Sequence, residues 1–172
     1  NFVDAWIIGE YAQIFLNSTK LVFGTLILNL TVSGLAGFSL AKLYPRGSNV
    51  FLVYLLVGVA IPAQMFILPL FLLWKELGLM NTHLGLIIIY AGLNAPFATF
   101  LIRSYMIQLP DELFDAAKID GANTLQLFYR IALPISWPVF LTTGLVVGLA
   151  VWNEFLFALT FVHDDSKKPI AT

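Results

Sequence analysis

The sequence has no cysteine and few charged residues. The absence of cysteine among 172 residues excludes disulfide bonds and thiolate metal sites. The two histidines, His83 and His163, lie far apart in expected loops, so no metal site is predicted. Charged residues make up 11% of the chain, whereas an ordinary soluble domain has about 25%. With 59% hydrophobic residues, the composition is typical of a protein embedded in a lipid bilayer.

Further absences narrow the function. A net charge of −1 provides no basic surface for nucleic acid. The phosphate-binding pattern Gly-x-x-x-x-Gly-Lys-Ser/Thr does not occur, so the chain is not expected to bind ATP, and no cofactor is predicted for it. The chain begins at Asn1 without a signal-peptide pattern, which we interpret as the start of an internal piece of a longer protein.

Long apolar runs are the main feature that the sequence does have. Residues 21–41, 50–74 and 84–102 carry no charge, and the run from 135 onward is uncharged until Glu154. A helix needs roughly 20 apolar residues to cross a bilayer, and it satisfies its own backbone hydrogen bonds in lipid. The sequence therefore predicts an all-α membrane protein, a polytopic helix bundle. The expected single domain covers residues 1–172, with spans at about 18–41, 50–74, 84–103 and 135–160.

The loops between the spans indicate an orientation. Loops 42–49 and 103–134 must lie on one side of the membrane, because two spans separate them. They hold five of the nine lysines and arginines, including every arginine. By the positive-inside rule, this bias favours the cytoplasm for the long loop. At the start of the first span, Asn17, Ser18 and Thr19 offer oxygens for a helix N-cap.

The long loop has the local signals of two short helices joined by a turn. Pro110 suits the first turn of a helix, and Gly121 is typical of the left-handed residue that ends one. Asn123 with Gln126 resembles a capping box for a second helix, which Pro134 closes. Each helix has an apolar face, comprising Leu113, Phe114, Ala116 and Ala117 in the first and Leu127, Phe128, Ile131 and Ala132 in the second.

Two interpretations of these apolar faces remain open. The loop is either an amphipathic elbow on its own membrane surface or a helix that fills a groove on another protein. The adjacent small side chains of Ala116 and Ala117 favour close approach by another protein, because deep lipid contact would prefer bulkier residues.

A motif of three parts lies in this loop: Asp115-Ala116-Ala117, then Gly121, then Ile131-x-Leu133-Pro134. Its residues and spacing resemble the EAA loop of permease subunits in binding-protein-dependent ABC importers. The family's usual glutamate is replaced by Asp115, which keeps the charge and shortens its reach. The resemblance implies that loop 104–134 couples the permease to a cytoplasmic ATPase subunit. The coupling residues that it implies are Asp115, Ala116, Ala117, Asp120, Gly121, Ala122, Phe128, Ile131, Leu133 and Pro134.

Other stretches extend the resemblance to carbohydrate importers of the maltose type. They are Asn17-Ser18, Ile61-Pro62, Leu77-Gly78-Leu79 and Trp152-Asn153-Glu154-Phe155. The family implies the type I ABC importer permease fold with a usual six spans, of which the first and last are absent here. It implies a transport subunit for sugars or oligosaccharides, not an enzyme, in the cell membrane of a prokaryote. Its expected partners are the lipid bilayer, a second permease subunit, ABC ATPase subunits that bind ATP and Mg, and an extracytoplasmic solute-binding protein.

Polar residues within the spans are candidates for the substrate path, because polar groups are costly inside a bilayer. Asn29 lies in a four-residue-spaced stripe with Thr25, Ser33 and Gly37, which suits helix packing more than a path.

Two further candidates lie beside prolines. Gln64 follows Pro62, and Asn94 precedes Pro96. A proline kink frees backbone groups, which must then face protein or a water-filled cavity. Each side chain could bind sugar hydroxyls or satisfy that freed backbone.

Glu154 is the one acid in an apolar run, and Asn153 precedes it. Its distance from the start of the last span places Glu154 near the far interface of the membrane. There it could be an outer gate, a contact for the binding protein or an inert exposed acid. A secondary transporter or channel fragment is the alternative function, but it would require coupling acids in the spans, and Glu154 meets that requirement poorly. A membrane assembly protein that transports nothing is a third possibility.

Overall fold

The computed structural model describes residues 11–172, and this part of the chain consists of helices and connecting turns, without a strand. It divides into two compact units, whereas the sequence predicts a single domain. The first unit comprises the described residues up to Leu28, together with Ile61–Leu93 and Val147–Thr172. The second comprises Asn29–Ala60 and Asn94–Val146, and it contains the whole of the long loop.

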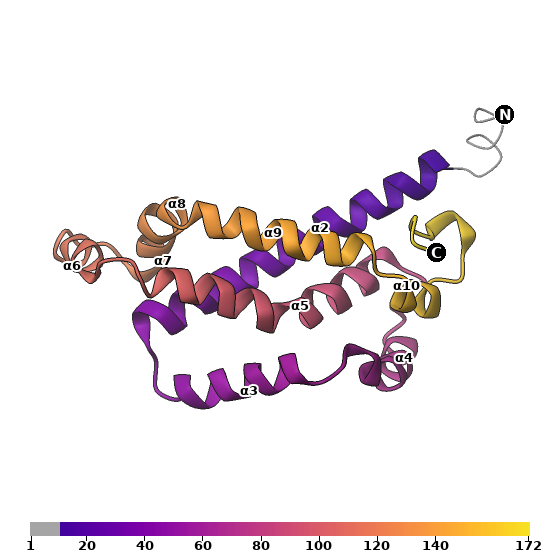
Figure 1. Cartoon of the computed structure of the whole chain (residues 1–172), viewed down its shortest axis with the longest axis horizontal. Coiled ribbons are helices and arrows are strands. Elements are labelled where there is room, and N and C mark those ends of the chain that lie inside the picture. Colours follow the sequence, from indigo (N-terminus) through magenta and orange to yellow (C-terminus); the bar gives the residue numbers. More distant parts are fainter. Residues whose placement is uncertain (1–10) are drawn as a thin grey trace. The chain divides into compact units, whose positions relative to one another are not determined.

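The first apolar run forms one continuous helix. Helix α2 spans Tyr11–Phe38 and continues into η1, a π-helical turn at Ser39–Leu43 (Figure 1). Together these 33 residues are long and apolar enough to cross a membrane. The predicted N-cap at residues 17–19 is wrong, because these residues lie inside the helix. The turn ends at Tyr44, whose φ of 44° is left-handed.

The second apolar run is broken near Pro62. Helix α3 (Ser48–Ala60) ends before this proline, and the 3-10 turn η2 (Ala63–Phe66) and helix α4 (Ile67–Glu76) follow it. Proline lacks an N–H and disfavours helical backbone at the residue before it, so a kink predicted from the sequence is found here. The predicted span 50–74 is therefore a bent pair of helices.

The third run is helix α5 (His83–Met106), which contains Pro96 without interruption. The fourth is bent at Ser136. Helix α9 (Trp137–Trp152) follows a bend of 77° after a helical stretch made of α7 (Thr124–Leu127), η3 (Phe128–Ala132) and α8 (Leu133–Ile135).

The continuous span predicted at 135–160 is wrong, because α9 stops at Trp152. A break follows, and the chain continues with helix α10 (Leu156–Phe161) and the short turn η4 (Asp165–Lys167). Within residues 11–172, two helices are long and apolar enough to span a membrane, and the number rises to four if each bent pair is one span. The all-α fold with about four spans is thus confirmed.

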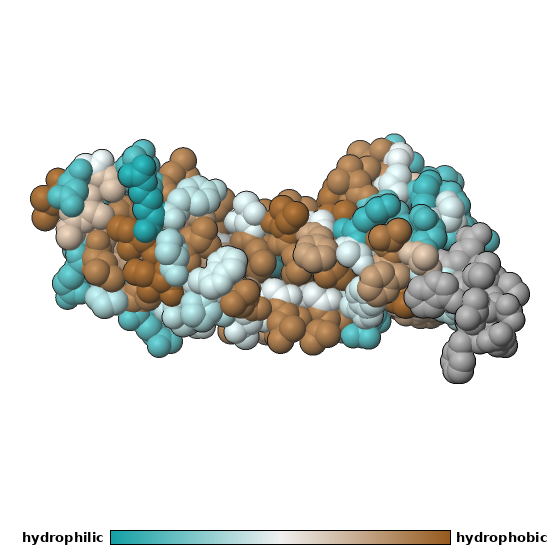
Figure 2. Space-filling model, turned by 90° about the horizontal axis from the view of Figure 1, so that it is seen from above, coloured by the Kyte–Doolittle hydropathy of each residue, from teal (hydrophilic) through white to brown (hydrophobic). Residues whose placement is uncertain are grey.

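Large hydrophobic side chains cover much of the helix surface (Figure 2). Ile27 is 70% exposed, Val50 is 75% exposed and Tyr54 is 70% exposed. A monomeric soluble protein rarely leaves such extended apolar surface in water. This surface therefore requires lipid or other hydrophobic helices to cover it.

Candidate functional site

The first helix of the long loop is α6 (Asp111–Ile119), and its two ends follow the local signals in the sequence. Asp111 and Glu112 lie in its first turn, where negative charge complements the helix dipole. Gly121 has a φ of 84°, as predicted. The N–H of Gly121 donates to the Lys118 carbonyl at 3.0 Å, and the N–H of Ala122 donates to the Ala117 carbonyl at 2.9 Å. This pair of bonds is a Schellman motif, which needs a left-handed residue at Gly121.

The second helical segment begins with the predicted capping box. The Asn123 side chain accepts from the Gln126 N–H at 3.0 Å, and the Gln126 side chain accepts from the Asn123 N–H at 2.8 Å. The segment then widens into η3, a π-helical turn that the sequence does not predict. The N–H of Leu133 donates to the carbonyl of Phe128, five residues back. Pro134 follows and has no N–H to continue the regular α pattern.

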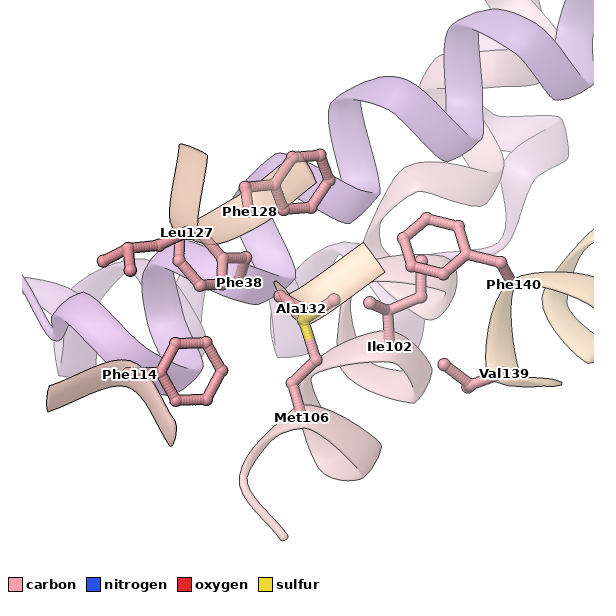
Figure 3. Packing of buried hydrophobic residues seen from close by; sticks show 9 residues of the cluster. All are labelled: Phe38, Ile102, Met106, Phe114, Leu127, Phe128, Ala132, Val139 and Phe140. Carbon is pink, nitrogen blue, oxygen red and sulfur yellow. The ribbon is translucent and has the colours of Figure 1, made fainter. Parts of the chain in front are cut away.

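The long loop has two helical arms, α6 and the segment formed by α7 and η3. A cluster of aromatic rings lies between these two arms (Figure 3). Phe38, at the end of α2, is 2% exposed. Its ring centroid lies 6.1 Å from that of Phe114 in α6 and 5.5 Å from that of Phe128 in η3. Ile102 and Met106 of α5 complete the cluster with Leu127, Ala132, Val139 and Phe140. The loop is therefore packed on the ends of α2 and α5.

The buried face of α6 is narrower than predicted. Phe114 is buried and Ala117 is partly buried, but Leu113 is 43% exposed and Ala116 is also exposed. The predicted face of the second segment is correct, because Leu127, Phe128 and Ala132 are buried and Ile131 is partly buried. Ile119, which lies outside the predicted apolar face of the loop, is 86% exposed.

The residues predicted for coupling fall into two groups. Those on the surface of the loop are Asp115, Ala116, Asp120, Gly121 and Pro134, whereas Ala117, Ala122, Phe128, Ile131 and Leu133 are buried or partly buried. The Asp115 carboxylate pairs with Lys118 at 2.9 Å, and both side chains remain more than half exposed. An exposed pair of this kind contributes little to stability. The exposed residues are thus available to a partner, while the buried residues stabilise the conformation of the loop.

Lys42 is a member of this site that sequence reasoning missed. Its ammonium donates to the Leu109 carbonyl at 2.6 Å and to the Asp111 carboxylate at 2.7 Å. The hydrogen bond from Lys42, and then its charge, lowers the pKa of the Asp111 carboxyl. The stabilisation from this pair is therefore present above the ordinary pKa of an aspartate, and it is lost as the pH falls through the lowered pKa.

The predicted path residues are divided between the two units. Asn29 is buried and Asn94 is partly buried in the second unit, whereas Gln64, Asn153 and Glu154 belong to the first. Gln64 is exposed in η2, directly after the break at Pro62.

The polar stripe on α2 contacts α5 in the second unit. The Ser33 hydroxyl donates to the Ala95 carbonyl at 3.3 Å. A Cβ added to Gly37 would lie 3.2 Å from the backbone nitrogen of Arg103, so the two helices approach closely there. These contacts support the packing interpretation of the stripe.

Glu154 caps helix α10, a role that the sequence does not predict. Its carboxylate accepts hydrogen bonds from the backbone N–H groups of Leu156, Phe157 and Ala158 at 3.0–3.2 Å. It also accepts one from the Tyr90 hydroxyl of α5 at 2.9 Å. The acid is partly buried and is occupied by donors of its own chain. It therefore differs from an inert exposed acid, whereas its roles as an outer gate or as a contact for the binding protein stay predictions.

Replacing Glu154 by alanine is expected to lower the free energy of unfolding by about 1–3 kcal/mol, because several N–H groups lose a charged acceptor. Tyr90→Phe removes one donor and should cost less. Asn153→Ala serves as the control, since its exposed side chain donates to the Leu149 carbonyl of the preceding helix and does not cap α10. Thermal unfolding in detergent measures the difference. Equal stability of Glu154→Ala and the control would contradict the capping role.

Asn17 and Ser18 hold the C-terminal segment of the chain. The Asn17 amide donates to the carbonyls of Ser166 and Lys168 at 2.8 Å and 3.1 Å, and the Ser18 hydroxyl accepts from the Ile170 N–H at 2.8 Å. Both side chains are buried in the first unit. They therefore join parts of the chain that are distant in sequence. Within residues 11–172, no group of acidic, histidine or cysteine side chains could hold a metal ion.

Comparison with known proteins agrees with this architecture. Residues 33–165 match the family described as binding-protein-dependent transport system inner membrane component. The chain is 36% identical to the probable ABC transporter permease protein YurM of Bacillus subtilis, over 99% of this chain and 56% of that protein. It is 31% identical to the diacetylchitobiose uptake system permease protein NgcG of Streptomyces coelicolor, over 97% of this chain and 55% of that protein.

Two further similarities extend the comparison. The arabinooligosaccharides transport system permease protein AraQ of Halalkalibacterium halodurans is 35% identical, over 91% of this chain and 56% of that protein. A crystal structure of a bacterial ABC transporter involved in the import of the acidic polysaccharide alginate matches with a TM-score of 0.84 at 25% identity, over 92% of this chain and 55% of that chain. The chain thus spans little more than half the length of the relatives that it matches.

Proposed function

Because this chain belongs to the family of binding-protein-dependent transport system inner membrane components, we propose that it is part of the permease of an ATP-driven sugar importer. In this proposal it forms a translocation path with a second permease subunit in the cell membrane of a prokaryote. Separate ATPase subunits bind ATP and Mg and hydrolyse the nucleotide, and an extracytoplasmic protein delivers the solute. The chain itself is a transport component.

The observation that carries the proposal is the exposed face of the ordered loop. Leu113, Ala116 and Ile119 present apolar surface, and Asp115 and Asp120 lie beside them. Isolated helices as short as α6 are marginal in water, but the aromatic cluster beneath holds α6 in place. A rigid helix with an uncovered apolar face suits a groove on another protein. We propose that this groove belongs to the ATPase subunit and that the loop is cytoplasmic.

Sugars or oligosaccharides are the proposed substrates. The names of relatives specify diacetylchitobiose and arabinooligosaccharides, and the matching structure belongs to a transporter for an acidic polysaccharide. Gln64, exposed after the helix break, and Asn94, beside Pro96, are the proposed contacts for sugar hydroxyls. Asn29 is buried, Asn153 donates to the Leu149 carbonyl and Glu154 caps α10, so we rank these three below the exposed Gln64.

Ile119→Glu tests the docking of the ATPase subunit. A charged side chain in place of the most exposed apolar residue of α6 must be desolvated on docking, so the affinity of the ATPase for the permease should fall about tenfold. The measurement is co-purification of the ATPase with the intact permease, together with ATP-driven sugar uptake in proteoliposomes. Ile170→Glu, at an exposed isoleucine of the first unit, is the control.

Unchanged docking and uptake in Ile119→Glu would contradict the assignment of this face. Uptake driven by an ion gradient, with no requirement for ATP, would instead favour a secondary transporter.

A further inference from the structure

The end of the first long helix carries a lysine that is almost completely buried. The side chain of Lys42 is 5% exposed, whereas that of its partner Asp111 is 80% exposed. Burying a cation is costly unless its hydrogen bonds are satisfied. Lys42 meets this requirement with the Leu109 carbonyl, the Asp111 carboxylate and the ring of Phe114, whose centroid lies 5.2 Å from the ammonium.

All three partners of Lys42 lie where the chain enters helix α6. Leu109 precedes the helix, Asp111 is its first residue, and Phe114 lies in its first turn. Within residues 11–172, Lys42 is the one side chain of another helix that donates a hydrogen bond to this segment. The lysine therefore holds the entrance of α6 through contacts with three different residues, which restricts rotation of the helix.

The position of Lys42 in its own helix also differs from that of an ordinary surface lysine. It lies in η1, the π-helical turn that ends the first membrane helix. Turns of this kind occur frequently at functional positions. Lys42 and Asp111 also line an open pocket of about 230 Å³, with Ala41, Phe114, Asp115 and Lys118. Solvent thus reaches the carboxylate, while the lysine stays anchored beneath it by Leu109 and Phe114.

We propose that Lys42 is a positioning residue that sets the orientation of α6 for the ATPase and transmits movement of α6 to the first membrane helix. This inference rests on the proposed function, because it assigns the mechanical connection between the docking helix and the membrane. The lysine connects them through charged hydrogen bonds at the entrance of α6, separately from the aromatic cluster that packs the loop as a whole. Removing its charge should therefore lower the amount of solute transported per ATP hydrolysed more than it destabilises the packing of the loop.

The test uses the intact transporter in proteoliposomes, with its second permease, ATPase and binding protein. Lys42→Met keeps the length of the side chain and removes its charge. We expect solute transported per ATP hydrolysed to fall about tenfold, which corresponds to the loss of one charged hydrogen bond. Lys42→Arg should retain most of the coupling. Lys20→Met, at an exposed lysine of the same helix, is the matched control and should behave as the original protein does.

A double-mutant cycle separates positioning from general stability. Asp111→Asn alone should also lower the solute transported per ATP hydrolysed. In the Lys42→Met background it should cause little further decrease, because the two residues act through one bond. Normal coupling in Lys42→Met would overturn the inference. So would a lower unfolding temperature with unchanged transport per ATP, because that result assigns Lys42 to folding alone.

The Ile119→Glu variant distinguishes this inference from the proposed function. If Ile119→Glu loses docking while Lys42→Met is normal, the function stands and the role of Lys42 is wrong. If neither variant has an effect and ATP drives no uptake, both proposals are wrong.

Discussion

Phe38→Ala is expected to lower the free energy of unfolding by about 3–5 kcal/mol, the usual cost of truncating a buried phenylalanine to alanine. Phe38 is 2% exposed, and its ring contacts both Phe114 and Phe128. The cavity would therefore open between the two arms of the loop, and each arm would lose a packing partner. Thermal unfolding in detergent measures the loss. Limited proteolysis should also show faster cleavage between α6 and α7 than in the original protein.

Phe23→Ala is the matched control for this prediction. Phe23 lies in the same helix but is 60% exposed, so its truncation opens no buried cavity. The control should change stability by much less, and the loop should resist proteolysis as before. If both variants unfold alike, or if the loop of Phe38→Ala resists cleavage, Phe38 does not join the two arms.

Gly121→Val is expected to lower both stimulated ATP hydrolysis and transport while the membrane helices remain folded. Gly121 has a φ of 84°, and an added Cβ would meet no atom within 4 Å. The damage therefore comes from backbone strain alone, about 1–3 kcal/mol for a residue held in an unfavourable conformation. Relief of that strain would change the direction of α6 relative to the capping box. Stimulated ATP hydrolysis and sugar uptake should fall roughly 5–150-fold, the range that corresponds to this strain.

Two controls separate backbone strain from the added volume of valine. Gly121→Asn should be tolerated better, because asparagine adopts left-handed backbone more readily than β-branched residues do. Gly92→Val adds the same side chain to a helical glycine that has open space around it and no positive φ. If Gly121→Val keeps normal stimulated hydrolysis in the reconstituted transporter, the turn does not orient the docking helix.

The features that could be predicted from the sequence depend on neighbouring residues. The hydropathy of each run predicts a membrane helix because lipid requires about 20 consecutive apolar residues. The end of α6 at Gly121 and the start of α7 at Asn123 follow from hydrogen bonds within a few residues of the chain. The kink near Pro62 has an equally local cause, the missing N–H of proline. The family motif uses the same local pattern, so it was recognisable without a structure.

The tertiary structure decided which polar residues are buried and what they bind. Lys42 is 69 residues from Asp111 and Glu154 is 64 residues from Tyr90, so no local pattern relates the members of either pair. Asn17 reaches Ser166, which is 149 residues away. A helical wheel shows which residues share a face, but it does not show which neighbour covers that face. Hydropathy therefore determined the membrane helices, and local capping residues determined the two-helix loop. Contacts between distant segments decided that Lys42 holds α6 and that Tyr90 binds Glu154.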